Sequence, residues 1–190
     1  MTFTDISVLF FLLVFTLSGY IINFIRGEKG VNIQYRNDMQ SLAWFRFLVP
    51  FGLVSSIAFY FSDIGKLSDS IVFVIIGCLL IITGLLIRWW SVLSLGNEFN
   101  VSLLIIKNHR LKTSGIYGLI RHPSYTGLLI YYIGLAVIMQ NIFSVVILIV
   151  FPAIAVINRI GKEEMLLSDY FKESYDVYCR NTKKLIPYIY

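Results

Sequence analysis

The longest stretch without an Asp, Glu, Lys or Arg residue covers residues 123–158. As a single α-helix it would be about 54 Å long, whereas the hydrocarbon core of a bilayer is about 30 Å thick. The strongly polar pair Gln140-Asn141 lies near its middle. We therefore predict two antiparallel membrane spans that fold back at this pair. Only 14% of the 190 residues are charged, about half the share in soluble domains, which excludes an ordinary soluble protein.

Three further spans are predicted before this hairpin. Residues 6–25 contain no charge and suffice to cross the core as a helix. A cleaved signal peptide is not expected, because the N-terminus lacks a basic region and a small-residue cleavage site. A second span lies within residues 39–62, where Arg46 can extend toward the headgroups, and a third covers residues 70–87. Arg88 and the two tryptophans after it are typical of a membrane interface. The predicted fold is thus an all-α membrane protein with about five transmembrane helices.

The distribution of basic residues predicts the orientation of these helices. Fourteen of the sixteen Lys and Arg residues fall in alternate connecting segments, on one side of the predicted membrane. The positive-inside rule therefore predicts an external N-terminus and a cytoplasmic C-terminus. The net charge of +5 is explained by this orientation and by contact with anionic lipid, and no basic run is dense enough for nucleic acid.

Two cytoplasmic segments, residues 91–122 and 159–190, are polar enough to form a site. In the second, apolar residues recur at helical spacing and predict a C-terminal amphipathic helix against the protein or the membrane interface. These residues are Leu167, Phe171, Tyr175 and Tyr178. That helix is expected to stop near Pro187.

The polar residues at the membrane boundary leave their roles open. Arg159 precedes Glu163 by four residues, so the two can share a helix face, either in a site or as an interfacial ion pair. His109 and His122 are the only histidines, and Cys78 and Cys179 lie in unrelated contexts, so neither a metal site nor a disulfide framework is expected. The residues alone therefore predict a basic pocket that contains histidine.

The order of motifs in residues 91–190 resembles the isoprenylcysteine carboxyl methyltransferases and the related phospholipid N-methyltransferases. The motifs are HRLKTSGIY at 109–117, RHPSYTG at 121–127, the pair Glu163-Glu164, the tyrosines Tyr175 and Tyr178, and Leu-Ile-Pro at 185–187. Residues 1–90 match only as three generic transmembrane helices. The resemblance therefore implies a methyltransferase-like region over residues 91–190, with the helical hairpin 123–158 between two cytoplasmic segments.

What the resemblance implies is an integral-membrane enzyme that uses S-adenosyl-L-methionine to methylate a lipophilic acceptor. The preferred acceptor is a carboxylate of the isoprenylcysteine type, on a small lipophilic or prenylated substrate in contact with membrane lipid. The implied cofactor-binding residues are His109, Arg110, Leu111, Lys112, Tyr117, His122, Pro123, Ser124, Tyr125 and Glu163. The implied catalytic residues are Arg159, which would also bind the acceptor, Glu163, and Arg121, for which anchoring at the interface is an equal alternative.

Several alternatives remain open at this point. Lys112 and Asn181 depart from the family pattern, so the acceptor could be an amine or a thiol. Membrane sterol and enone reductases carry a similar Arg-His-Pro-x-Tyr segment and use NADPH, and a non-catalytic scaffold could keep the same fold. Short loops are typical of a prokaryotic inner-membrane protein, with the active site facing the cytoplasm.

Overall fold

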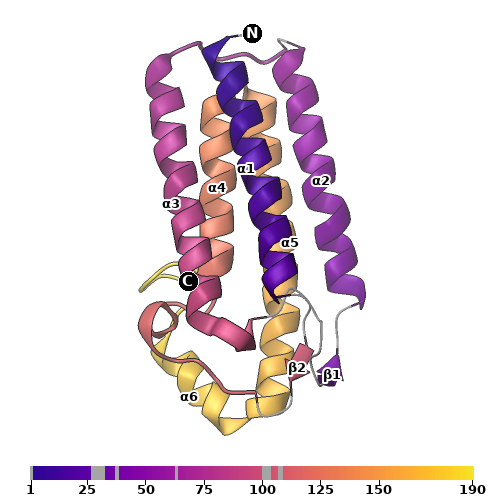
Figure 1. Cartoon of the computed structure of the whole chain (residues 1–190), viewed down its shortest axis with the longest axis vertical. Coiled ribbons are helices and arrows are strands. Elements are labelled where there is room, and N and C mark those ends of the chain that lie inside the picture. Colours follow the sequence, from indigo (N-terminus) through magenta and orange to yellow (C-terminus); the bar gives the residue numbers. More distant parts are fainter. Residues whose placement is uncertain (1, 27–32, 37–38, 63, 100–103, 107–108) are drawn as a thin grey trace.

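The computed structural model describes residues 2–26, 33–36, 39–62, 64–99, 104–106 and 109–190. Five long helices run side by side, as Figure 1 shows, and they correspond to the five predicted spans. They are α1 (Phe3–Arg26), α2 (Met39–Phe61), α3 (Ile71–Leu95), α4 (Pro123–Met139) and α5 (Ile142–Phe171). Of these, α1, α3 and α5 are long and apolar enough to cross a membrane, whereas the apolar stretches of α2 and α4 are shorter. The fold is thus that of a helical membrane protein, and the five-span count and the orientation stay predictions.

The turn between α4 and α5 forms where the sequence predicts it. Gln140 ends α4 in the left-handed conformation, with φ at 47°. The buried Asn141 caps α5, since its Oδ1 accepts hydrogen bonds from the backbone N–H groups of Phe143 and Ser144. Its Nδ2 donates to the carbonyl of Ile64 at 2.7 Å. One amide side chain therefore starts α5 and joins it to the segment after α2.

Helices α3 and α4 pack backbone against backbone through two pairs of glycines. An added Cβ on Gly84 would lie 2.6 Å from the carbonyl oxygen of Gly127, and one on Gly127 would lie 2.5 Å from that of Gly84. Two helical turns away, Gly77 and Gly134 repeat the arrangement. An added Cβ on either would lie 2.6 or 2.8 Å, respectively, from the carbonyl oxygen of the other. Such approach is possible only where both helices lack a side chain.

The structure adds one element that the sequence did not predict. Beside the helices, the short strand β1 (Ile33–Arg36) pairs antiparallel with β2 (Leu104–Ile106). Pairing of segments this short and this distant along the chain leaves too little periodicity to predict.

The C-terminal apolar stripe belongs to two helices rather than one. Helix α5 continues to Phe171, and Lys172 then adopts a φ of 50° before α6 (Glu173–Asn181) begins. Tyr175 and Tyr178 are buried, and the Tyr178 hydroxyl donates to the carbonyl of Tyr117 at 2.7 Å. These tyrosines hold α6 against the protein. An interfacial position of α6 stays a prediction.

The residues after α6 run across the start of α4. Lys183 and Lys184 accept backbone hydrogen bonds from Arg121 and His122, at 2.8 and 3.0 Å. Two short 3₁₀ helices, η1 (Gly96–Glu98) and η2 (Gly115–Gly118), lie between α3 and α4. Helix α3 continues through residue 90 without a break. The predicted division of the chain into residues 1–90 and 91–190 stays a prediction.

Candidate active site

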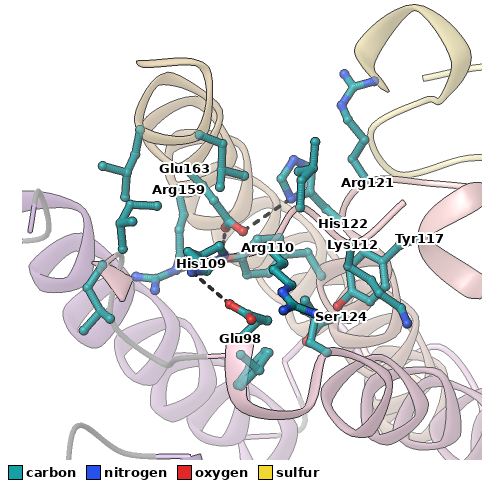
Figure 2. A pocket seen from close by; sticks show the side chains of 18 of the residues that line it. Glu98, His109, Arg110, Lys112, Tyr117, Arg121, His122, Ser124, Arg159 and Glu163 are labelled. Carbon is teal, nitrogen blue, oxygen red and sulfur yellow. Dashed lines mark hydrogen bonds and ion pairs between the residues drawn. The ribbon is translucent and has the colours of Figure 1, made fainter. Parts of the chain in front are cut away.

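The predicted site residues other than Pro123 line one pocket (Figure 2). The segments that carry them lie at the end of the bundle remote from the α4–α5 turn (Figure 1). The walls of the pocket come from α3, the start of α4, the second half of α5 and the segments between α3 and α4. The predicted residues that line it are His109, Arg110, Leu111, Lys112, Tyr117, Arg121, His122, Ser124, Tyr125, Arg159 and Glu163. Pro123 does not line the pocket: it is buried in the first turn of α4, where its missing N–H breaks no hydrogen bond.

A hydrogen-bonded chain of three side chains crosses the pocket. Arg159 Nε donates to the Tyr125 hydroxyl at 2.8 Å, and that hydroxyl donates to Glu163 Oε2 at 2.8 Å. Arg159 is buried, and Glu163 keeps 27% of its side chain exposed. Because Tyr125 comes from α4 and the other two from α5, the hydroxyl joins an opposite-charge pair across two helices. Their four-residue spacing does place both on the pocket face.

The adjacent glutamate, Glu164, serves a different set of partners. Its Oε1 accepts a hydrogen bond from Arg121 Nε at 3.0 Å and lies 3.3 Å from His122 Nε2. Its Oε2 lies 2.8 Å from Lys184 Nζ. His122 Nδ1 in turn lies 3.8 Å from Glu163 Oε1. Glu164 thus orients Arg121, His122 and Lys184, whereas Glu163 faces into the pocket.

Arg121 is directed away from the centre of the pocket, as Figure 2 shows. Besides Glu164, its guanidinium donates to the backbone carbonyls of Cys179, at 3.2 Å, and Thr182. These contacts tie the C-terminal segment to the start of α4. The geometry favours a positioning role for Arg121, and its catalytic role stays a prediction.

On another wall, Glu98 and His109 face each other (Figure 2). Glu98 Oε2 lies 3.3 Å from His109 Nδ1, although the two groups are not aligned for a hydrogen bond. Burial lowers the pKa of His109, and the nearby Glu98 carboxylate opposes that shift. Burial therefore favours the neutral form of His109.

This pKa predicts a loss of stability in mild acid. The unfolded chain, with a histidine pKa of about 6.5, takes up a proton more readily than the folded protein, so folding weakens as the pH falls below about 6.5. The variant His109→Gln cannot take up this proton. As the pH falls, the free energy of unfolding of wild type should therefore decrease relative to that of the variant, by at most about 1.4 kcal/mol per pH unit. Thermal unfolding of both proteins between pH 7.5 and 5.5 measures the effect. A difference in unfolding temperature that is constant with pH would contradict it.

The pocket also contains residues that the sequence analysis did not predict. They are Phe45, Arg88, Leu95, Glu98, Phe99, Leu104, Ile105, Leu166, Leu167 and Tyr178. Most are apolar and carry no sequence signal that separates them from lipid-facing residues. Arg88 is the exception: interpreted as an interface residue, it lies in the pocket and donates to Ser124 Oγ at 3.3 Å. An arginine within an apolar helix is itself a signal of a functional site.

Comparison with known proteins places this arrangement in a family. The family model described as "Isoprenylcysteine carboxyl methyltransferase (ICMT) family" matches residues 75–169. Protein-S-isoprenylcysteine O-methyltransferase A of Arabidopsis thaliana is 32% identical over 115 residues, 60% of this chain and 58% of that protein. The Saccharomyces cerevisiae protein-S-isoprenylcysteine O-methyltransferase is 31% identical over 137 residues, 70% of this chain and 57% of that protein.

A solved structure agrees with this match. The eukaryotic intramembrane Ras methyltransferase ICMT superposes with a TM-score of 0.65 at 27% identity, covering 74% of this chain and 52% of that one. The chain spans about three fifths of the length of the plant relatives that it matches. These relatives are eukaryotic, so the prokaryotic membrane stays a prediction. The matched residues include α4 and most of the pocket, and the chain belongs to the isoprenylcysteine carboxyl methyltransferase family.

Proposed function

We propose that this protein is an integral-membrane methyltransferase that uses S-adenosyl-L-methionine to methylate a carboxylate of the isoprenylcysteine type. The observation that carries the proposal is the chain Arg159–Tyr125–Glu163. It presents one cationic and one anionic group in a single pocket, inside the region matched by the family. We place this pocket on the cytoplasmic side of five spans, because the segments that form it carry most of the basic residues.

The pocket residues fit the charges of the cofactor. S-adenosyl-L-methionine carries a carboxylate and an ammonium, and its sulfonium supplies the methyl group. Glu163, which faces the pocket, suits the ammonium. The positive end of the α4 dipole and the Ser124 hydroxyl suit a carboxylate. The segment 109–112 and Tyr117 form the remaining wall.

The acceptor is assigned from the other half of the pocket. Arg159 Cζ lies 5.8 Å from the centre of the Phe45 ring. Apolar residues of β2 and α5 line the same part of the pocket: Leu104, Ile105, Leu166 and Leu167. An apolar wall beside a guanidinium suits a lipophilic group that ends in a carboxylate. Carboxylates have a pKa near 4 and are ionised at neutral pH, so no general base is required. Arg159 would orient the acceptor oxygen, and exclusion of water would raise its reactivity.

The first test is binding of S-adenosylhomocysteine to the purified protein in lipid nanodiscs. We expect saturable binding, and a loss of about tenfold or more in affinity for Glu163→Gln, which removes the charge that faces the ammonium. Asp169→Asn is a matched control, because Asp169 is an exposed carboxylate further along α5. An absence of binding to wild type would contradict the proposed cofactor.

The second test identifies the acceptor. Transfer of a labelled methyl group to an S-farnesylcysteine derivative should give a product that is hydrolysed by base, as a methyl ester is. A base-stable product formed from a lipid extract would instead indicate methylation of an amine or thiol. Stabilisation of the protein by NADPH alone would favour a reductase.

A further inference from the structure

Arg88 is held in the pocket by the close packing of α3 and α4. An added Cβ on Gly127 would lie 2.8 Å from the backbone nitrogen of Arg88 and 3.2 Å from its Cα. The α3 backbone at Arg88 therefore rests directly on α4. The side chain extends into the pocket and donates to the buried Ser124 hydroxyl at 3.3 Å.

Among the residues that the structure describes, no carboxylate pairs with Arg88. Over the described ranges, Ser124 is its hydrogen-bond partner, and no carboxylate lies within 4.0 Å of its guanidinium. A guanidinium inside an apolar helix bundle is costly unless it meets an anion. The two carboxylates that line the pocket, Glu98 and Glu163, face His109 and Tyr125 instead. An anionic group of a bound ligand would supply the missing charge.

The start of α4 lies between Arg88 and Arg159, two of the arginines that line the pocket. Ser124 accepts from Arg88 of α3, and the next residue, Tyr125, accepts from Arg159 of α5. Successive side chains on a helix diverge by about 100°, so the two arginines meet α4 at different points around its axis. Two separated guanidinium groups suit two carboxylates, and the proposed reaction brings two into the pocket, one on the cofactor and one on the acceptor.

We propose that Arg88 and Ser124 bind the α-carboxylate of the cofactor, an inference that rests on the proposed function. The acceptor carboxylate belongs with Arg159, which lies against Phe45 and the apolar wall that suits a lipid chain. Ser124 lies in the first turn of α4 beside His122, where the positive end of the helix dipole also favours an anion. Arg88 is thus a binding residue for the amino-acid end of the cofactor.

The test compares two ligands that differ at that end. S-adenosylhomocysteine contains the amino acid, whereas 5′-methylthioadenosine keeps the nucleoside and thioether but lacks it. In Arg88→Gln, affinity for S-adenosylhomocysteine should fall about tenfold or more, and affinity for 5′-methylthioadenosine should change less than twofold. Arg88→Lys should show a smaller loss. Arg46→Gln is the control, because Arg46 is an exposed arginine of α2 and should affect neither ligand.

Other results would overturn the inference. An equal loss for both ligands would mean that Arg88 only supports the pocket, and unchanged affinity for both with a raised KM for the acceptor would assign Arg88 to the acceptor. If Arg88→Gln does not fold, Arg88→Lys carries the test, and an equal change in affinity for the two ligands in that variant would overturn the inference. Failure of wild type to bind S-adenosylhomocysteine at all would instead remove the proposed function.

Discussion

Replacing Gly127 by valine is expected to abolish the native packing of α3 on α4. Even the Cβ would lie 2.5 Å from the carbonyl oxygen of Gly84 and 2.8 Å from the backbone nitrogen of Arg88, and both are backbone atoms that no rotamer change can move. The helices would have to separate along the buried centre of the bundle, which includes Ile81 and Tyr131. We expect a loss of more than about 3 kcal/mol, at or beyond the upper end for overpacked cores.

Smaller substitutions grade this effect and control for it. Gly127→Ala introduces the Cβ alone and should cost about 1–3 kcal/mol, and Gly84→Ala should cost a similar amount. Gly19→Ala and Gly161→Ala place the same methyl group in α1 and α5 where no atom lies within 4 Å, so they should be neutral or slightly stabilising. Thermal unfolding in one detergent measures all four proteins. Equal unfolding temperatures for Gly127→Ala and Gly161→Ala would contradict the close packing.

The helices could be predicted from the sequence because the bilayer imposes a simple rule. A segment that crosses the hydrocarbon core must be apolar, about 20 residues long and helical, so charge-free stretches locate helices directly. The turn at Gln140-Asn141 was predictable for the same reason, since it interrupts a stretch too long for one span. The strands β1 and β2 obey no such rule, because their pairing depends on residues about seventy positions apart.

The site could be predicted only in part, and mainly through the family motifs. The motifs pointed to His109, His122 and Glu163 together, and all three line the pocket. Neither the direction of a side chain nor its partners follow from a motif. In the sequence the two residues of the pair Glu163-Glu164 cannot be told apart. Successive positions on a helix point in different directions, so Glu163 lines the pocket and Glu164 binds Arg121 and Lys184. Arg88 was interpreted as an interface anchor, which its position at the end of a predicted span suits, and that interpretation gave no sign of its place in the pocket.

Replacing Arg159 by methionine is expected to reduce methyl transfer by about 10³-fold, because it removes the group proposed to orient the acceptor carboxylate. Affinity for S-adenosylhomocysteine should change little, since we propose that other residues bind that ligand. The loss should appear mainly in kcat/KM for the acceptor. If Arg159→Met lost cofactor affinity and activity in proportion, Arg159 would belong to the cofactor subsite instead.

Tyr125→Phe tests whether the hydroxyl between Arg159 and Glu163 affects methyl transfer by holding Arg159 in position. Without it, these two oppositely charged side chains, one helical turn apart on α5, can pair directly and neutralise each other. We expect a fall of about tenfold in kcat/KM with little change in unfolding temperature. The variant Arg159→Lys lacks the Nε–H that bonds to Tyr125, so adding Tyr125→Phe to it should cost much less than it costs alone. If the two losses multiply independently, Tyr125 does not act by holding Arg159, and the hydrogen-bonded chain is only a structural link.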